Sequence, residues 1–85
     1  MFKYTVVVTR TVYKLLDKLP DKVATTLENK MLELENDPRP VGCKKLKGRN
    51  GYRIRSGNYR IIYEVDDKII TVTIIDVGDR KDIYR

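Results

Sequence analysis

The 85-residue sequence predicts an α+β fold with the element order β-α-α-β-β-β, in which a helical hairpin covers one face of a small, mainly antiparallel twisted sheet. Three observations lead to this fold class. A short alternating segment opens the chain, two stretches with apolar residues at helical spacing follow, and the second half alternates apolar and polar residues between turn signals. This length has room for one hydrophobic core, so we expect a single domain over residues 1–85.

Residues 2–8 alternate along their length, which predicts a half-buried strand. Thr9 or Thr11 can cap the helix that follows, because a threonine hydroxyl accepts hydrogen bonds from free backbone N–H groups at a helix start. Pro20 ends this helix. Its apolar stripe recurs at helical spacing and consists of Val12, Leu15, Leu16 and Leu19.

A second helix is predicted from Asp21 to about Asn36. The Asp21 carboxylate favours the helix start through the helix dipole, and Asp37-Pro38 ends the helix because the residue before proline avoids the helical region. The apolar stripe consists of Val23, Ala24, Leu27, Met31 and Leu34. Two amphipathic helices with so short a link form a hairpin that can lie on one face of a sheet.

The second half of the chain begins with a basic stretch. Residues 39–50 hold one proline and two glycines among lysines and predict a loop with Leu46 as its apolar anchor. A turn is expected at residues 66–68. The β-branched segment Ile69–Val77 is predicted to be the central and best-buried strand, ended by Gly78.

Between these segments, residues 51–63 predict a β-hairpin with its turn at residues 56–58. A Ser56-Gly57 loop would place Arg53 opposite Arg60, and a Gly57-Asn58 loop would place Arg55 opposite Arg60. Either loop puts all three arginines on one face, because side chains alternate along a strand. The other face is the natural core face and holds Tyr52, Ile54, Tyr59, Ile61 and Tyr63. Opposed like charges destabilise a sheet, so an anionic partner would explain the arginines.

The charge distribution supports such a partner. The net charge is +6, yet residues 38–63 hold eight basic and no acidic side chains, which leaves the rest of the chain at −2. Such a region attracts polyanions such as RNA, DNA or an acidic protein segment, although a basic face that only aids solubility is the simpler alternative. The candidate RNA contacts outside the hairpin are Lys44, Lys45, Lys47 and Arg49.

Several chemistries lack the residues they need. The sequence has no histidine, and Cys43 is its only cysteine, so we expect no disulfide, no metal site and no Ser-His or Cys-His catalysis. Glycine-rich nucleotide loops are absent, so no cofactor is expected. We see no signal peptide and no apolar run long enough to span a membrane, and with the single cysteine this favours a cytoplasmic protein.

RNA cleavage needs little more than arginines, because the 2′-hydroxyl of the substrate is the nucleophile and no metal is required. Guanidiniums stabilise charge on phosphate oxygens well, but they stay protonated and are poor general bases. Tyr84 could stack on a base or relay a proton, and Asp79 could act as a base. Each also has a purely structural alternative, as a tyrosine packed along the terminus and an aspartate in a turn.

The sequence closely resembles the RelE side of the RelE/ParE superfamily of bacterial toxins from toxin–antitoxin systems. The resemblance spans nearly the whole chain and is carried by the segments 46–48, 52–55, 57–64 and 77–84, which read LKG, YRIR, GNYRIIYE and VGDRKDIY. It implies a compact fold of this kind and an mRNA endonuclease that acts in the ribosomal A site without a metal. It also implies a cognate antitoxin, with operator DNA bound only through the toxin–antitoxin complex.

The resemblance also implies roles for individual residues. Arg53 and Arg55 match basic positions that orient the RNA and assist activation of the 2′-hydroxyl. Arg60 matches the arginine that holds the scissile phosphate, Arg80 a second arginine at the transition state, and Tyr84 the tyrosine that stacks on the substrate.

Two departures from the family pattern bear on activity. Arg53 and Arg55 stand where some members carry lysine, and Asp79 stands where many carry histidine or lysine. Two other functions therefore remain open, namely a ParE-like inhibitor of DNA gyrase without nuclease activity and an attenuated module that only binds nucleic acid or a partner.

Overall fold

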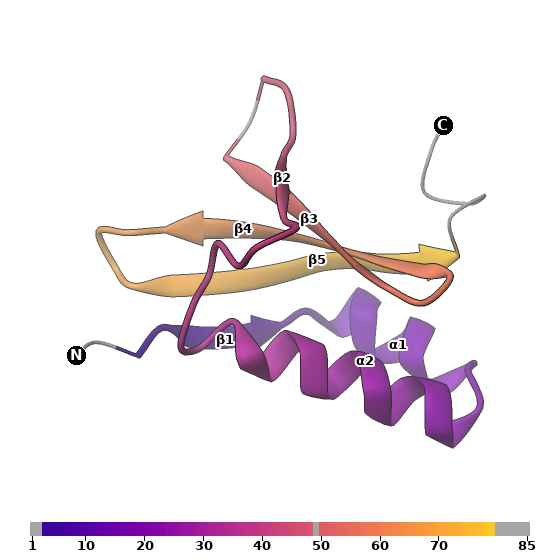
Figure 1. The fold of residues 1–85 in the computed structure, drawn as a ribbon. Helices are drawn as coiled ribbons and strands as arrows, with labels where there is room; N and C mark the ends of the chain where they lie inside the picture. The colour runs from indigo at the N-terminus through magenta and orange to yellow at the C-terminus, as the bar shows by residue number, and fades with distance from the viewer. Residues whose placement is uncertain (1–2, 49, 80–85) are drawn as a thin grey trace.

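A computed structural model describes residues 3–48 and 50–79 of the chain, and Figure 1 shows their arrangement. The α+β fold class is confirmed, with two helices followed by a mainly antiparallel sheet. The elements in chain order are β1 (Thr5–Val8), α1 (Arg10–Asp17), α2 (Asp21–Glu33), β2 (Lys44–Lys45), β3 (Gly51–Ser56), β4 (Tyr59–Asp66) and β5 (Thr71–Asp79). The short strand β2 lies inside the stretch that the sequence predicts as a basic loop.

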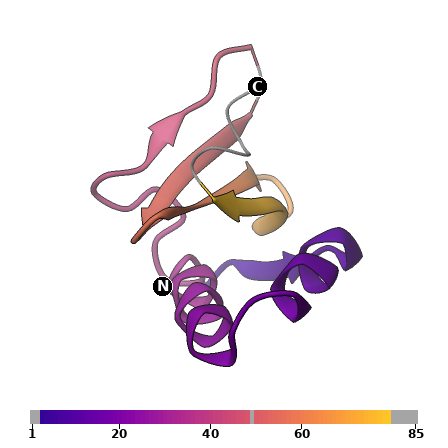
Figure 2. The ribbon, with the colours of Figure 1, turned by 90° about the vertical axis from the view of Figure 1, so that its right-hand side faces the viewer.

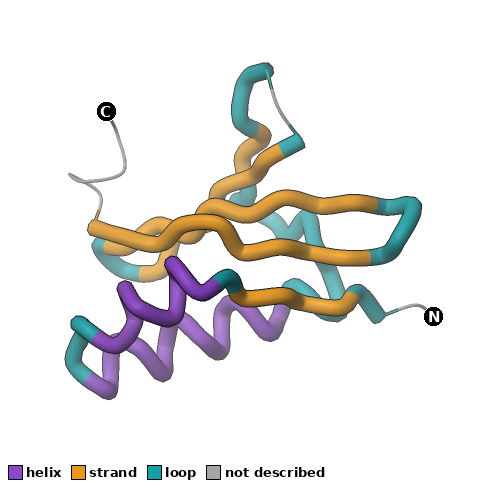
Figure 3. Tube along the Cα trace, turned by 180° about the vertical axis from the view of Figure 1, so that it is seen from behind, coloured by secondary structure: helices purple, strands orange, loops and turns teal. Residues whose placement is uncertain are grey.

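The five strands form one sheet in the order β1-β5-β4-β3-β2. Strand β1 runs parallel to β5, and the other neighbours are antiparallel. Both helices lie on the same side of this sheet, as the views in Figures 2 and 3 show. Parallel strands need a long connection between them, and the two helices and strands β2–β4 between β1 and β5 provide one.

The expectation that residues 69–77 form the central, best-buried strand was wrong. Strand β4 is central, and it has more buried positions than β5, whose threonines lie half-exposed on the face away from the helices. Gly78 does not end β5 either. It pairs with Arg60 and the strand continues to Asp79, because ladder hydrogen bonds use only backbone groups, which glycine retains.

The hydrophobic core lies between the helices and the sheet. Its fully buried members come from α1, the α2 region and the two longest strands, β4 and β5, and they include Val12, Leu27, Met31, Leu34, Ile61, Tyr63, Val72 and Ile74. The two predicted helical stripes are therefore confirmed as core faces. The threonine cap is not, because the Thr9 hydroxyl donates to the Ile74 carbonyl oxygen at 2.9 Å and ties the start of α1 to β5 instead.

Strand β5 carries a β-bulge at Ile75. The register pairs Tyr63 with Ile74 and Ile62 with Asp76, so Ile75 has no partner on β4. An extra residue reverses the facing of everything after it, which is why Ile74 and Val77 both point into the core although they are three positions apart. Asp76 therefore faces away from the helices.

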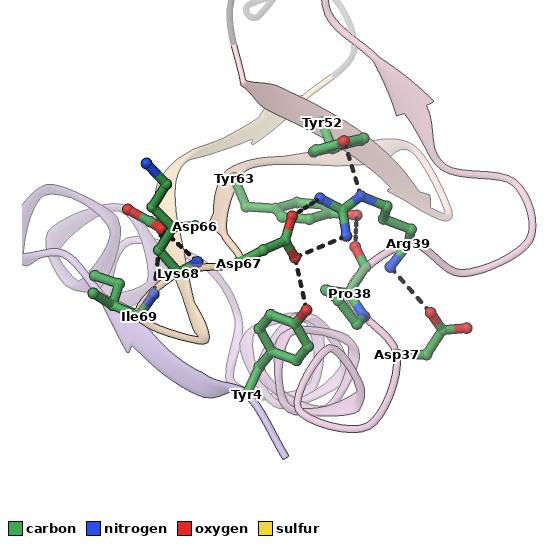
Figure 4. Close-up of polar contacts among 10 residues, drawn as sticks. All are labelled: Tyr4, Asp37, Pro38, Arg39, Tyr52, Tyr63, Asp66, Asp67, Lys68 and Ile69. Carbon is green, nitrogen blue, oxygen red and sulfur yellow. Dashed lines mark hydrogen bonds and ion pairs between the residues drawn. The ribbon is translucent and has the colours of Figure 1, made fainter. Parts of the chain in front are cut away.

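A polar cluster, which we call the Arg39 clasp, consists of Tyr4, Arg39, Tyr52 and Asp67 (Figure 4). The Arg39 guanidinium donates to both carboxylate oxygens of Asp67, at 3.2 and 2.8 Å, and its Nε donates to the Tyr52 hydroxyl oxygen at 2.9 Å. Tyr4 donates its hydroxyl to Asp67 at 2.7 Å. The clasp joins the segment before β1, the loop before β2, strand β3 and the β4–β5 turn, and it engages one cation of the basic stretch within the chain.

We expect the pH dependence of stability to report on this clasp. The Arg39 guanidinium and then the Tyr4 hydroxyl lower the pKa of Asp67 below its ordinary value of 3.8. The folded state thus favours the charged carboxylate. The resulting stabilisation is fully present at pH values above the ordinary pKa of Asp67 and is lost as the pH falls through the lowered pKa of the folded state. Urea unfolding between about pH 6 and about pH 3 should show a shallower loss of stability in Asp67→Asn than in wild type. Asp17→Asn, on the exposed side of α1, should follow the wild-type curve.

Beneath the clasp, the Tyr63 hydroxyl donates to the Pro38 carbonyl oxygen at 2.7 Å, and both residues are buried. Burial raises the pKa of this hydroxyl, which keeps it protonated as a donor. Tyr63→Phe should lower the free energy of unfolding by about 1–3 kcal/mol, because the buried carbonyl loses its donor. Urea denaturation measures this loss. Tyr13→Phe, at a residue 52% exposed on α1, should leave stability unchanged within error.

Candidate phosphate-binding face

The hairpin between β3 and β4 is confirmed, and its register decides between the two predicted loops. Ser56 pairs with Tyr59, so Gly57 and Asn58 form the loop and Arg55 lies opposite Arg60. Gly57 has a φ of 60° and Asn58 has a negative φ, which is the pattern of a type II′ turn. A side chain at Gly57 would be strained in this conformation, so the glycine fixes the loop and with it the partner of Arg60.

The register places four cations on the sheet face away from the helices. Arg55 is opposite Arg60 across β3 and β4, and Lys44 of β2 is opposite Arg53. Arg53 shares the facing of Arg55, because the two are separated by one residue of the same strand. We call Lys44, Arg53, Arg55 and Arg60 the arginine face. The predicted common facing of the three arginines is therefore confirmed.

The spacing within the arginine face follows from the ladder. The pair that closes a two-residue loop is hydrogen-bonded, so the next pair, Arg55 with Arg60, is of the non-hydrogen-bonded type whose side chains approach most closely. Their Cβ atoms are expected about 4.5–5.5 Å apart, and Arg53 is the diagonal neighbour of Arg60. Three guanidiniums thus originate within reach of a single phosphodiester group.

Burial divides the arginine face into two parts. Arg55 and Lys44 are exposed, whereas Arg53 is 9% and Arg60 only 2% exposed. Burying a guanidinium costs free energy that other interactions of the folded state must offset. This cost arises at both Arg53 and Arg60. Arg55 is accessible from solvent in this structure, whereas Arg60 is covered.

The other predicted site residues are distributed differently. Lys45 pairs with Tyr52 and therefore has the opposite facing to Lys44, although both side chains are exposed, as is that of Lys47. Asp79 pairs with Tyr59 and shares the facing of Val77, so it projects from the helix side of the sheet and not from the arginine face. The remaining predicted residues, Arg49, Arg80 and Tyr84, lie outside the described residues.

Sequence reasoning missed Asp76. The register sets it opposite Ile62, on the same face as Arg60, because the bulge at Ile75 reverses the alternation. The signal was present in the sequence. Buried residues at 72 and 74 are followed by an apolar residue at 77, a step of three where an unbroken strand has a step of two. The same break moves Asp79 off the arginine face.

Within the described part of the chain, no group of three or more histidine, cysteine, aspartate or glutamate side chains could hold a metal ion. None of the helices described there is long and apolar enough to cross a membrane.

The structure is a small α+β domain whose sheet carries clustered guanidiniums on the face opposite its helices, a charge distribution that attracts polyanions. The chain belongs to the RelE/ParE family of toxins of type II toxin–antitoxin systems. Residues 3–84 match the family described as the ParE toxin of the type II toxin–antitoxin system parDE. This match confirms the superfamily on which the sequence resemblance rests.

The individual relatives carry RelE or RelG names. The chain is 38% identical to Toxin RelG of Mycobacterium tuberculosis, covering 96% of this chain and 97% of the relative. It is 36% identical to the mRNA interferase toxin RelE of Escherichia coli, covering 79% and 75%. Among solved structures, the RelBE2 toxin–antitoxin complex of M. tuberculosis superposes with a TM-score of 0.83 at 32% identity, covering 96% of this chain and 97% of that one. The archaeal RelE–RelB complex of Pyrococcus horikoshii gives 0.83 at 30% identity, covering 94% and 98%.

Proposed function

We propose that this toxin is an endoribonuclease that cleaves mRNA by metal-free transesterification. The observation that carries the proposal is the pairing of Arg55 with Arg60, flanked by Arg53, on a sheet face that gains nothing in folding from like charges. The arginine face supplies what phosphodiester cleavage requires most, namely fixed positive charge at the phosphate oxygens. The naming of a 36% identical relative as an mRNA interferase supports the same activity.

The proposed reaction proceeds in one displacement. The 2′-oxygen attacks the adjacent phosphorus, the bond from phosphorus to the 5′-oxygen breaks, and the products are a 2′,3′-cyclic phosphate and a 5′-hydroxyl. Arg60 and Arg55 neutralise the two non-bridging oxygens as charge accumulates on them, and bidentate guanidinium contacts suit this geometry. Arg53 orients the strand. By their positions in the family motif, Arg80 contributes a further cation and Tyr84 stacks on a base.

The substrate and partners follow from the family. We infer that the toxin acts on mRNA in the ribosomal A site, with Lys44, Lys45, Lys47 and Arg49 contacting the RNA backbone. We also infer a cognate antitoxin that neutralises it, since the solved relatives include several toxin–antitoxin complexes. Operator DNA would be bound only by that complex.

Induced expression tests the proposal. The wild-type chain should arrest growth and translation, and primer extension on transcripts recovered after induction should show cuts at fixed positions within codons. The proposal also predicts a short acidic antitoxin reading frame beside the gene, whose co-expression should abolish both effects. Growth arrest with intact transcripts would refute the endoribonuclease.

A gyrase inhibitor is the second candidate, because the matching family description names a ParE toxin. It predicts toxicity with intact mRNA and with supercoiling by purified gyrase blocked. An attenuated binding module is the third. It predicts no growth arrest from the wild-type chain and no gain of activity in Asp79→His.

A further inference from the structure

The bulge at Ile75 places a carboxylate within the arginine face. Asp76 lies opposite Ile62 of β4, and the next pair toward the hairpin loop is Arg60 with Gly78. Asp76 is therefore the diagonal neighbour of Arg60 on the same face, at a spacing that side chains can bridge. Gly78 has no side chain to stand between them.

The carboxylate is half-buried and only partly engaged. Its Oδ1 accepts a hydrogen bond from the Val77 N–H at 2.9 Å, and within residues 3–48 and 50–79 it forms no ion pair. This bond fixes the orientation of the carboxylate and leaves Oδ2 as an acceptor. Glu64, the other carboxylate near the cations, lies exposed opposite Gly51 and Thr73, two pairs beyond Ile62 and farther from Arg60.

The proposed reaction lacks a proton acceptor among the arginines, which remain protonated at any physiological pH. Resting on that proposed function, we propose that Asp76 is the general base that takes the proton of the attacking 2′-hydroxyl. The proton moves from the 2′-oxygen to Oδ2 as the bond from that oxygen to phosphorus forms. The bond to the 5′-oxygen breaks, and the departing 5′-oxygen takes its proton from water.

The charged groups around Asp76 agree with this role. Arg60, which contacts the phosphate in the proposed reaction, is the cation diagonal to the carboxylate, and from β4 only Glu64 adds a second negative charge nearby. A phosphate on the arginines thus brings the adjacent ribose toward the edge of the cluster where Asp76 lies. Asp79, which the sequence suggests as a possible base, lies on the opposite face of the sheet and projects from the helix side, so it is poorly placed for this step.

Asp76→Asn is the direct test, since the amide oxygen can still accept the Val77 N–H. Single-turnover cleavage of mRNA by purified toxin on programmed ribosomes should slow by about 100-fold or more, since about 100-fold is the lower end of the usual general-base contribution. RNA affinity should be unchanged or tighter, because a negative charge beside the cations is removed. Glu64→Gln removes the same charge from the same face and should cleave at the wild-type rate. Equal melting temperatures for the three proteins confirm intact folds.

A substrate with a 5′-thio leaving group separates base from acid, because a thiolate leaves without protonation. The Asp76→Asn defect should persist on this substrate if Asp76 is the base. If Asp76→Asn cleaves the ordinary substrate at the wild-type rate, or recovers on the thio substrate, Asp76 is not the base. Cleavage by the wild-type protein in the same experiment would still support the proposed function. If the wild-type protein cleaves no RNA, the proposed function itself fails.

Discussion

Arg60→Ala should reduce the rate of mRNA cleavage by about 100- to 1,000-fold, the usual effect of removing one preorganised donor to a developing oxyanion. Arg60 is central to the arginine face, since Arg55 is its direct partner and Arg53 its diagonal neighbour. Loss of its guanidinium therefore leaves one phosphate oxygen without its contact. The measurement is single-turnover cleavage on programmed ribosomes, together with growth after induction.

Because Arg60 is only 2% exposed, alanine could act by unfolding the chain, and a second variant separates the two effects. Arg60→Lys retains a charge and most of the volume but loses the two parallel donors, so it should also cleave slowly while melting close to wild type. Arg10→Ala, at the exposed start of α1, is the matched control and should retain full activity. Full toxicity of Arg60→Ala would remove the arginine face from the mechanism.

Val77→Asp should lower the free energy of unfolding by about 3–5 kcal/mol or more, because it places an unpaired carboxylate in the core. Val77 is 2% exposed and has this position only because the bulge reverses the facing of β5. For a domain whose total stability is of the order of 5–15 kcal/mol, such a loss leaves much of the protein unfolded at 37 °C. Urea denaturation followed by circular dichroism measures it.

Asp76→Val is the matched substitution on the adjacent residue and should change stability little, since Asp76 faces away from the helices. An unbroken alternation along β5 would give the opposite order, with Asp76 in the core and Val77 outside. A mild Val77→Asp variant beside a strongly altered Asp76→Val variant would therefore contradict the bulge.

The sequence could predict which hairpin side chains lie on each face of the sheet, because both possible loops give the same distribution. Every second residue from Tyr52 to Tyr63 is apolar or aromatic on either side of the loop, and this alternation is independent of the turn. The partner of Arg60 could not be predicted, because Ser-Gly and Gly-Asn both suit a two-residue loop. The register in the structure identifies Arg55 as that partner.

The remaining features depended on long-range contacts, or on a sequence signal too weak to decide between two readings. Strand β2 is two lysines long and shows no alternation, so nothing distinguishes it from loop. The ion pair of Arg39 with Asp67 joins positions 28 residues apart, so the sequence alone leaves Arg39 among the eight basic residues predicted to attract a polyanion. The placement of Asp76 and Asp79 required the bulge, whose three-residue step is easily taken for ordinary variation in a β-branched strand.

The brevity of β2 affects how copies of this chain meet one another. Among the described strands, β2 pairs with β3 only at Tyr52 and Arg53, so the outer backbone edge of β3 from Ile54 to Ser56 has no neighbouring strand. An uncovered edge is a template for sheet extension between molecules, and positive charges along it oppose that extension. Lys44 and Arg55 stand at this edge. Salt that screens these two cations should therefore promote self-association, because the charges proposed to bind phosphate also oppose edge-to-edge contact between molecules.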